Sequence, residues 1–239
     1  MGRFRRYRNG FTLIELLAVV ALISILMAIG VPAFARMIRS SRVDDTARSI
    51  RLALEQAQMC AADERRYVAV IFPNGSVADA LKPYRLGGYR LAYVRKVSKN
   101  SYEFVDWVDG SDWSNAPGGA VLTQIATSKF TASDAGDVSG CTQKITDKLK
   151  GCDKLNAVAG VKDDDGNDIY VGDDCAVIFN KYGGTENTSK LYLLISEASV
   201  NGDDMAYPAA DGRPSSGKTV NYRVLKVNNL TGRVGFTNE

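Results

Sequence analysis

Apolar residues follow three different spacings along the chain, and each spacing predicts a different element. Between residues 11 and 34 nearly every position is apolar, and the only polar or charged side chains are Thr12, Glu15 and Ser24. At about 1.5 Å per residue, these 24 residues would form a helix of about 36 Å, enough to cross a hydrocarbon core of about 30 Å. We therefore predict a membrane-spanning helix over residues 11–34.

After residue 34 the apolar positions recur every three or four residues, as on one face of an amphipathic helix. This face comprises Val43, Ala47, Ile50, Leu54, Ala57 and Ala61. Residues 35–66 are accordingly expected to continue the helix, so that a single helix runs from about Phe11 to about Arg65. Its second half is expected to bury one face against the rest of the protein.

From residue 67 the pattern changes to alternation and to residues that favour strands. Strands are predicted at residues 67–72, 88–97, 102–108, 120–125, 169–171, 176–179, 191–196, 220–227 and 233–237, with turn residues between them. Residues near 131–168 and 197–217, rich in Asp, Gly, Ser and Ala, are expected to be irregular insertions. The predicted fold class is therefore α+β, with the long N-terminal helix packed on an antiparallel sheet in a β-rich domain over residues 67–239.

Composition changes this picture mainly by what it excludes. The chain has 30 Lys plus Arg, 27 Asp plus Glu and no His. Without histidine, Ser-His-Asp and Cys-His nucleophilic sites and His-ligated zinc or haem are excluded, and no other nucleophile and base stand out. We therefore expect a protein that is not an enzyme and holds no cofactor.

The first ten residues carry Arg3, Arg5, Arg6 and Arg8 and no acidic residue. Positive charge next to a membrane helix marks its cytoplasmic end, so residues after 34 are expected outside the cytoplasm. Glu15 is unusual within this helix, because an acidic side chain costs about 2.5–3.5 kcal/mol near the bilayer centre and somewhat less toward its surface. Such a residue usually has a function.

Residues 10–16, GFTLIEL, follow the Arg-rich leader and resemble the class III signal of type IV pilins and type II secretion pseudopilins. The resemblance implies that prepilin peptidase cleaves between Gly10 and Phe11 and that Phe11 is then N-methylated. Residues 1–10 would be the cleaved leader, and residues 11–34 would lie in the membrane and then in a filament core.

The same resemblance implies an assembly role for Glu15, which would pair with the α-amino group of a neighbouring subunit. The alternative is an intrahelical pair with the amine of Phe11, four residues earlier. Pro32 is expected to bend the helix, as a proline does in many pilins, because it removes a backbone donor and crowds the preceding turn.

Residues 47–97 and 219–237 are similar in pattern to H-type minor pseudopilins and FimT-like minor pilins. This implies a minor subunit of a type IV pilus or type II secretion pseudopilus. It would lie in the bacterial inner membrane with its domain in the periplasm, and its partners would be other pilins or pseudopilins and the secretion or pilus assembly machinery. The alternatives are a major subunit, a DNA-binding minor pilin of a DNA-uptake system, and a simply anchored extracytoplasmic binding domain or enzyme.

Four cysteines outside the cytoplasm are expected to form disulfides. Cys141 and Cys152 enclose ten residues of an irregular segment, and we favour that pairing. Cys60 would then pair with Cys175, although three connectivities remain open. Zinc is the competing interpretation, but no C-x-x-C spacing occurs.

An acidic segment supplies oxygen ligands of the kind that calcium prefers. Its candidate ligands fall at positions 1, 3, 5 and 12 of an EF-hand template: Asp163, Asp165, Asn167 and Asp174. Position 6, which requires glycine, is Asp168. A solvated acidic turn is therefore favoured over a calcium site.

Basic residues near the C-terminus form a partial candidate for a DNA-binding face, because cationic side chains bind phosphate. They are Lys218, Arg223, Lys226 and Arg233. A soluble edge hairpin protected by its charges is the favoured interpretation.

Overall fold

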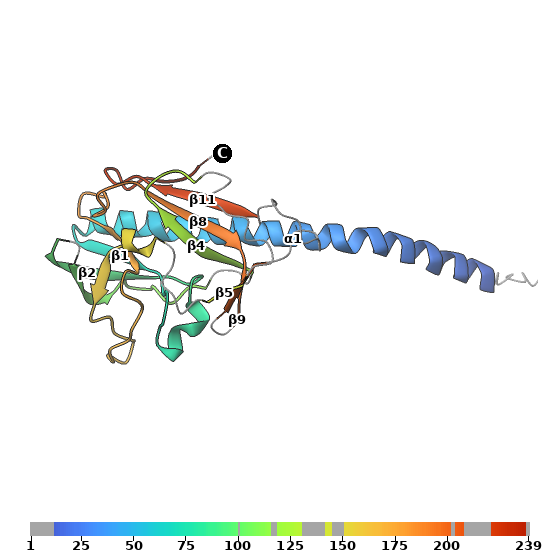
Figure 1. Cartoon of the computed structure of the whole chain (residues 1–239), viewed down its shortest axis with the longest axis horizontal. Coiled ribbons are helices and arrows are strands. Elements are labelled where there is room, and N and C mark those ends of the chain that lie inside the picture. The colour runs from blue at the N-terminus through green and yellow to red at the C-terminus, as the bar shows by residue number, and fades with distance from the viewer. Residues whose placement is uncertain are drawn as a thin grey trace, which may run out of the picture. The chain divides into compact units, whose positions relative to one another are not determined.

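The computed structural model describes residues 12–99, 101–115, 119–130, 142–144, 151–201, 204–207 and 221–237. The chain divides into two compact units, residues 1–39 and residues 40–239. Helix α1 (Leu13–Asp63) has 51 residues and contributes to both units (Figure 1). The prediction of one long helix is confirmed, with each end within two residues of the expected position.

The second unit contains three sheets among its described residues. The five-stranded sheet has the order β6 (Ala157–Ala159), β3 (Ser101–Trp107), β2 (Arg90–Ser98), β1 (Tyr67–Ile71) and β7 (Ala176–Phe179). The four-stranded sheet has the order β12 (Val234–Phe236), β11 (Tyr222–Val227), β8 (Leu191–Glu197) and β4 (Ala120–Ala126). All neighbours in these two sheets are antiparallel except β3 and β6.

The smaller sheet has the order β5 (Thr142–Lys144), β10 (Asp204–Ala206) and β9 (Ser199–Asn201). Two short 3-10 helices, η1 (Asp79–Tyr84) and η2 (Cys152–Lys154), complete the described elements. The fold class is therefore α+β, as predicted, but the β-rich part is built from several sheets rather than one.

The predicted apolar face of α1 forms the centre of the main core. All six of its residues are at most 1% exposed, and they pack with side chains from both larger sheets. Figure 1 shows α1 running alongside strands of these sheets. Strand β1 lies between two clusters, because Val68 and Val70 join the main core while Ala69 and Ile71 join a second cluster with Trp107. Burial on both faces explains why β1 reads as a continuous apolar run.

Most predicted strands are present. Those expected at 67–72, 88–97, 102–108, 120–125, 176–179, 191–196, 220–227 and 233–237 correspond to β1, β2, β3, β4, β7, β8, β11 and β12. The strand expected at residues 169–171 is wrong: the N–H of Ile169 and the carbonyls of Tyr170 and Val171 bond to three different residues, 161, 78 and 74, instead of to one ladder.

The expectation of irregular insertions near 131–168 and 197–217 is only partly correct. Their described residues include β5, β6, β9, β10 and η2. The four strands have three residues each, too short for the alternation that identifies a strand in sequence.

Candidate assembly site on the N-terminal helix

Thr12 and Glu15 close the start of α1 with reciprocal hydrogen bonds. The backbone N–H and the hydroxyl of Thr12 donate to Glu15 Oε2 at 2.9 and 2.8 Å, and the Glu15 N–H donates to Thr12 Oγ1 at 3.3 Å. This arrangement is a capping box, which satisfies backbone donors that have no partner within the helix. Glu15 remains exposed, and its Oε1 atom accepts no hydrogen bond from the described residues.

The capping box changes the intrahelical alternative for Glu15. Among the described residues, the hydrogen-bond partner of Glu15 is Thr12. The alternative had placed the partner amine on Phe11, one residue earlier. Gly10 and Phe11 lie outside the described residues, so cleavage between them and methylation of Phe11 remain predictions. The carboxylate has a role within its own helix and remains exposed.

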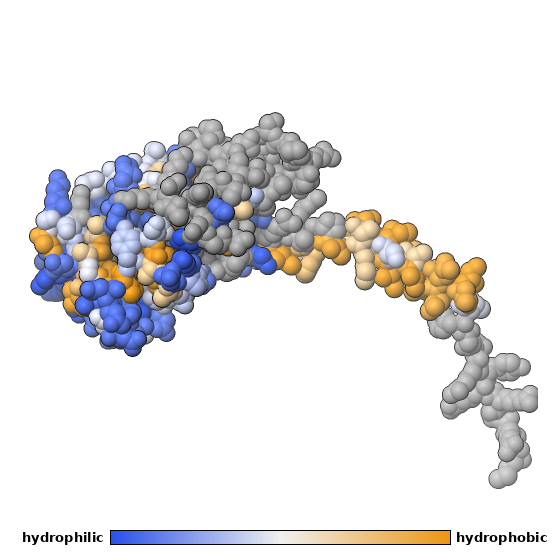
Figure 2. Space-filling model, turned by 60° about the horizontal axis from the view of Figure 1, so that its bottom comes forward, coloured by the Kyte–Doolittle hydropathy of each residue, from blue (hydrophilic) through white to orange (hydrophobic). Residues whose placement is uncertain are grey.

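The first unit exposes a long apolar surface. Residues 13–31 form a candidate membrane span of 19 residues with a mean hydropathy of 2.7, and none of it is buried. Figure 2 shows this apolar surface along the helix. Leu13 is 82% exposed, Ile29 70% and Phe34 61%. A contiguous apolar surface of this extent marks contact with lipid or with other proteins.

Ser24 does not interrupt this surface. Its hydroxyl donates to the Val20 carbonyl at 2.8 Å, so the polar group is satisfied within the helix. Beyond its first turn, the segment up to residue 31 is therefore apolar on all sides apart from this satisfied hydroxyl.

An open apolar groove of about 590 Å³ surrounds Gly30 in the first unit, lined by Ile23, Leu26, Met27, Gly30, Val31, Phe34 and Ile38. A Cβ atom at Gly30 would meet nothing within 4 Å, so the glycine leaves space on the helix surface. Small residues let a second helix approach closely. The side chain of Pro32 lies outside the described part, and the bend expected there remains a prediction.

The expected bridge between Cys60 and Cys175 is absent, and both thiols are free. Cys60 packs against the main core, whereas Cys175 is fully buried in the second cluster. The sequence argument paired Cys60 with Cys175 only because the other two cysteines were already paired. It did not take account of the different clusters in which the two thiols pack. Cys141 lies outside the described residues, so its pairing with Cys152 remains a prediction.

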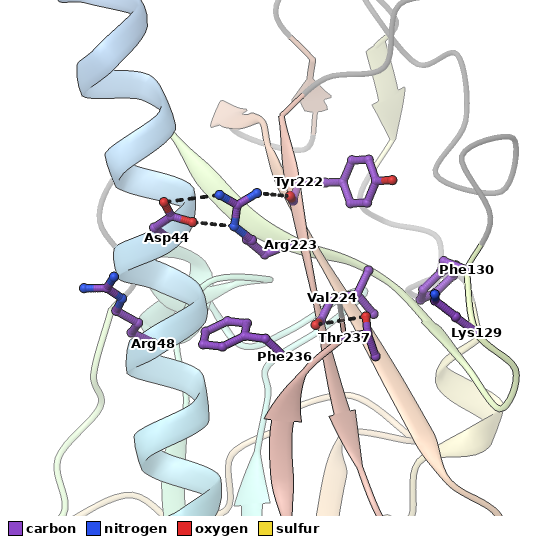
Figure 3. A pocket seen from close by; sticks show the side chains of 9 residues that line it. All are labelled: Asp44, Arg48, Lys129, Phe130, Tyr222, Arg223, Val224, Phe236 and Thr237. Carbon is purple, nitrogen blue, oxygen red and sulfur yellow. Dashed lines mark hydrogen bonds and ion pairs between the residues drawn. The ribbon is translucent and has the colours of Figure 1, made fainter. Parts of the chain in front are cut away.

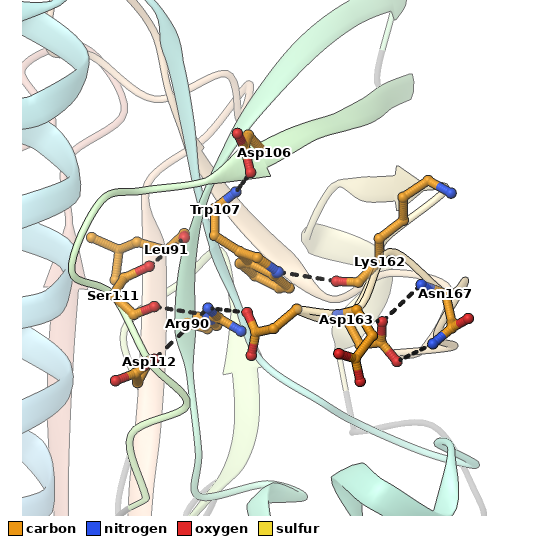
Figure 4. Close-up of polar contacts among 11 residues, drawn as sticks. Arg90, Leu91, Asp106, Trp107, Ser111, Asp112, Lys162, Asp163 and Asn167 are labelled. Atoms are coloured by element: carbon orange, nitrogen blue, oxygen red, sulfur yellow. Dashed lines mark hydrogen bonds and ion pairs between the residues drawn. The ribbon is translucent and has the colours of Figure 1, made fainter.

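The acidic segment forms a tight hairpin over residues 162–168, which we call the acidic hairpin (Figure 4). Asp163 Oδ1 accepts the backbone N–H groups of Asp165 and Asn167 at 3.0 and 2.7 Å. The Asn167 side chain donates to Oδ2 at 3.1 Å. These hydrogen bonds, with those from Asn167 the strongest, lower the pKa of Asp163.

Asp163 therefore organises the acidic hairpin from within, and its oxygens face the hairpin's own N–H groups. Asp168 forms an ion pair with Lys162 at 3.1 Å. The described residues contain no group of three or more acidic, Cys or His side chains arranged to hold a metal ion. Calcium binding by Asp163, Asp165, Asn167 and Asp174 remains an untested proposal.

Arg90 anchors the acidic hairpin, and sequence analysis missed it. Its side chain is 5% exposed, donates to Asp164 at 2.7 Å and to the Ser111 carbonyl at 2.9 Å, and lies 4.1 Å from the centre of the Trp107 ring (Figure 4). The Trp107 indole in turn donates to the Lys162 carbonyl at 3.0 Å. An arginine at a strand start gives no sequence signal for such a role.

The candidate DNA-binding residues do not form one free basic face among those that are described. Arg223 forms an ion pair with Asp44 at 2.6 Å, Lys226 is half-buried, and Arg233 is exposed. Lys218 lies outside the described residues. Because Asp44 already neutralises Arg223, this part of the surface gives the DNA hypothesis no added support.

Gln58 joins α1 to two turns from different parts of the chain, another contact that the sequence did not predict. Its side-chain amide donates to the carbonyls of Gly183 and Thr231 at 3.1 and 2.6 Å. The turns themselves touch, because a Cβ atom at Gly232 would lie 1.9 Å from the Gly183 carbonyl oxygen. One helical residue therefore holds together the turn after β7 and the turn between β11 and β12.

Comparison with known proteins bears mainly on the N-terminal segment. Residues 5–31 carry the prokaryotic N-terminal methylation motif. This match includes Gly10, Phe11 and Glu15, and it confirms the resemblance seen at residues 10–16. The methylation motif ends within the apolar helix and does not extend into the second unit.

Two crystal structures of the type IV minor pilin FimU from Pseudomonas aeruginosa are distantly similar to the chain. In space group P21 the TM-score is 0.37 at 11% identity, covering 83% of this chain and 90% of FimU. In space group P65 the values are 0.34 and 10%, with coverage of 82% and 92%. These TM-scores and identities are too low to indicate a function for this chain. No curated protein matches the chain.

Proposed function

We propose that the chain is a structural, non-catalytic subunit of a type IV pilus or type II secretion pseudopilus, of the minor class. Prepilin peptidase would cleave it between Gly10 and Phe11 and methylate Phe11. The mature chain would remain in the bacterial inner membrane, with the second unit in the periplasm, until it assembles with other pilins or pseudopilins.

One observation carries this proposal: an apolar helical span with no buried residue begins inside the methylation motif and carries an exposed carboxylate at Glu15. A simple membrane anchor needs only the apolar residues. The acidic residue is costly in lipid unless a cation compensates it. Cleavage at Gly10 would create such a cation, the new α-amino group, at the start of every subunit.

The capping box refines how the pairing would work. Thr12 donates to Glu15 Oε2, whereas Oε1 accepts no hydrogen bond from a described residue and would receive a neighbour's amine. Because each subunit would have one such amine and one such oxygen, pairing would fix the axial offset between adjacent helices. We propose that Glu15 sets the register of assembly in this way.

The processing step is tested by the intact mass of the protein purified from native membranes. A chain that begins at Phe11 and carries one added methyl group would support the proposal. A chain that begins at Met1, or one cut after the apolar helix, would overturn it.

The assembly role of Glu15 is tested by separating its charge from its capping bonds. Glu15→Gln keeps an acceptor for the Thr12 donors and removes the charge, because glutamine also occurs at this position of a capping box. Thr12→Ala weakens the cap and keeps the charge. We expect Glu15→Gln to stop incorporation into filaments and Thr12→Ala to reduce it only slightly, measured as the ratio of subunit in sheared filaments to subunit in membranes. The opposite order would show that Glu15 only caps the helix.

A further inference from the structure

A half-open pocket of about 240 Å³ lies in the second unit, between η2 and the loop that joins β7 to β8. Hydroxyl, amide and carboxylate side chains form most of its lining: Thr127, Asp153, Asn156, Asn187, Thr188 and Ser189. Its volume is below the range of about 300–1,000 Å³ that suits drug-sized ligands. The pocket, which we call the polar pocket, would therefore hold a single small ring.

Side-chain hydrogen bonds join the two walls of the polar pocket. The Asn156 amide donates to Asn187 Oδ1 at 3.3 Å, and the Asn187 amide donates to the Lys154 carbonyl at 2.6 Å. Asn156 is 3% exposed, and its backbone exchanges hydrogen bonds with the backbone of Ala176. The walls are therefore fixed before a ligand enters, and a preformed site loses little conformational entropy on binding.

Several polar groups of the lining have hydrogen-bonding capacity to spare. The hydroxyls of Thr127, Thr188 and Ser189 make no hydrogen bond with a described residue. Asn156 Oδ1 accepts none within the described part of the chain, and Asp153 contacts Lys154 through Oδ2 alone. Both donors and acceptors are thus available in one small pocket. This combination suits a ligand with several hydroxyl groups, because a hydroxyl both donates and accepts.

The charges of the polar pocket are already paired. Lys154 forms an ion pair with Asp153, and Glu186, whose side chain is 12% exposed, forms one with Lys96. An anionic ligand would meet Asp153 and a cationic ligand would meet Lys154. Neither would find an unpaired opposite charge in the lining to offset its loss of hydration. The lining therefore favours a neutral ligand.

Two leucines give the polar pocket a small apolar surface. Leu155 and Leu191 belong to the lining and are 6% and 1% exposed. A purely apolar ligand would cover them but would leave the surrounding polar groups without partners, which is costly once water is excluded. A sugar ring meets both requirements, since it carries hydroxyls around its edge and C–H groups on its faces.

The larger pocket of the second unit lacks this chemistry. It has a volume of about 540 Å³ and lies between α1 and the strands β11 and β12 (Figure 3). Arg223 lies 2.6 Å from Asp44 there, and the Thr237 hydroxyl donates to the Val224 carbonyl at 3.5 Å (Figure 3). Because these polar groups bond within the fold, the larger pocket serves as a control site.

We propose that the polar pocket binds one neutral sugar residue, either a free sugar or a residue of a glycan. Its hydroxyls would bond to Asp153, Asn156 and the hydroxyls of Thr188 and Ser189, with a C–H face toward the two leucines. The proposal goes beyond the proposed function because it needs neither cleavage at Gly10 nor assembly through Glu15. The two proposals can therefore fail separately.

Saturation-transfer difference NMR with the full chain tests this binding. The protein is kept in a polyoxyethylene detergent, because a detergent with a sugar headgroup would compete. The neutral probes are glucose, galactose, mannose and N-acetylglucosamine, each as the free sugar and as its methyl glycoside. A methyl glycoside represents a residue within a glycan. Methyl phosphate and methylammonium are the charged probes.

We expect at least one neutral probe to bind with a dissociation constant of about 1 mM. Thr188→Val should weaken its binding about fivefold, the loss of one hydrogen bond, and adding Ser189→Ala should bring the loss to about tenfold or more. The matched substitution in the larger pocket, Thr237→Val, should change binding less than about twofold. Binding of the methyl glycoside would identify a glycan residue as the ligand, and binding of the free sugar alone would identify a free sugar.

Three results would overturn the proposal: no binding by any neutral probe, unchanged binding in the variants of the polar pocket, or tighter binding of a charged probe. Near-ultraviolet circular dichroism checks that each variant is folded. The Thr188 and Ser189 hydroxyls make no hydrogen bond with the residues that the structure describes, so their removal should leave the fold intact.

Discussion

Replacing Gly232 by alanine should destabilise the second unit, because two turns and a helical side chain meet at this glycine. Its φ is +65°, a conformation that an L side chain rarely adopts, and an added Cβ would lie 1.9 Å from the Gly183 carbonyl oxygen. It would also lie 2.9 Å from Gln58 Nε2. The neighbour at 1.9 Å is backbone, so a rotamer change cannot relieve the contact.

The magnitude follows from three contributions. The left-handed conformation costs about 1 kcal/mol for alanine relative to glycine. Moving the Gly183 turn away weakens the two hydrogen bonds that Gln58 donates to Gly183 and Thr231, each contributing about 1 kcal/mol. The sum is a loss of about 3 kcal/mol in the free energy of unfolding, with local relaxation lowering it and residual strain raising it.

Urea unfolding of the full chain in nonionic detergent, followed by tryptophan fluorescence, measures this loss as a lower midpoint. Gly235→Ala is the matched control, since it lies three residues away and a Cβ there would meet nothing within 4 Å. We expect a change within about 0.5 kcal/mol for the control. Equal effects of the two substitutions would refute the role assigned to the contact between the turns.

Three further predictions concern the core, a buried thiol and the acidic hairpin. Leu54→Ala should cost about 3 kcal/mol in urea unfolding because Leu54 is fully buried, whereas Leu52→Ala, at a 64% exposed position, should cost less than about 0.5 kcal/mol. Burial raises the pKa of the Cys175 thiol to about 12, so iodoacetamide at about pH 8 should modify Cys60 first and Cys175 only on unfolding, as peptide mass spectrometry would show. The pKa of Asp163 is lowered in the folded state by hydrogen bonds from Asn167, so its stabilisation of the hairpin is complete above the unfolded value of about 3.9 and is lost as pH falls through the lower folded value. The Asn167 amide signal in NMR spectra should shift in that acidic range, and Asp163→Asn should abolish the step.

The helix and most strands were predictable because their signals are local. The spacing of Val43, Ile50 and Leu54 identifies the buried helix face without knowledge of its partner, and the same residues are at most 1% exposed in the structure. The N-terminal motif was equally accessible, since its residues are contiguous. Such patterns do not predict which face of a buried strand packs in which hydrophobic cluster, as for β1.

Most of the missed features depend on contacts between distant residues. Gln58 and Arg90 have no distinctive neighbours in sequence, and their roles come from turns and loops that folding brings to them. The Cys60 to Cys175 pairing failed for the same reason, because the two thiols pack in different clusters. The capping box at Thr12 and Glu15 was within reach of sequence, since a threonine followed three residues later by glutamate is its usual signature.

Strand β1 has a consequence for the order in which the protein folds. Ile71 pairs with Arg90 on one side and with Ala176 on the other, 105 residues further along the chain (176 − 71). During synthesis one edge of this apolar strand therefore stays open until most of the chain has emerged, a high contact order that slows folding. An open apolar edge recruits other strands. A fragment that stops before residue 176 should therefore aggregate or need a chaperone, although it contains the whole helix and the first hairpin of the sheet.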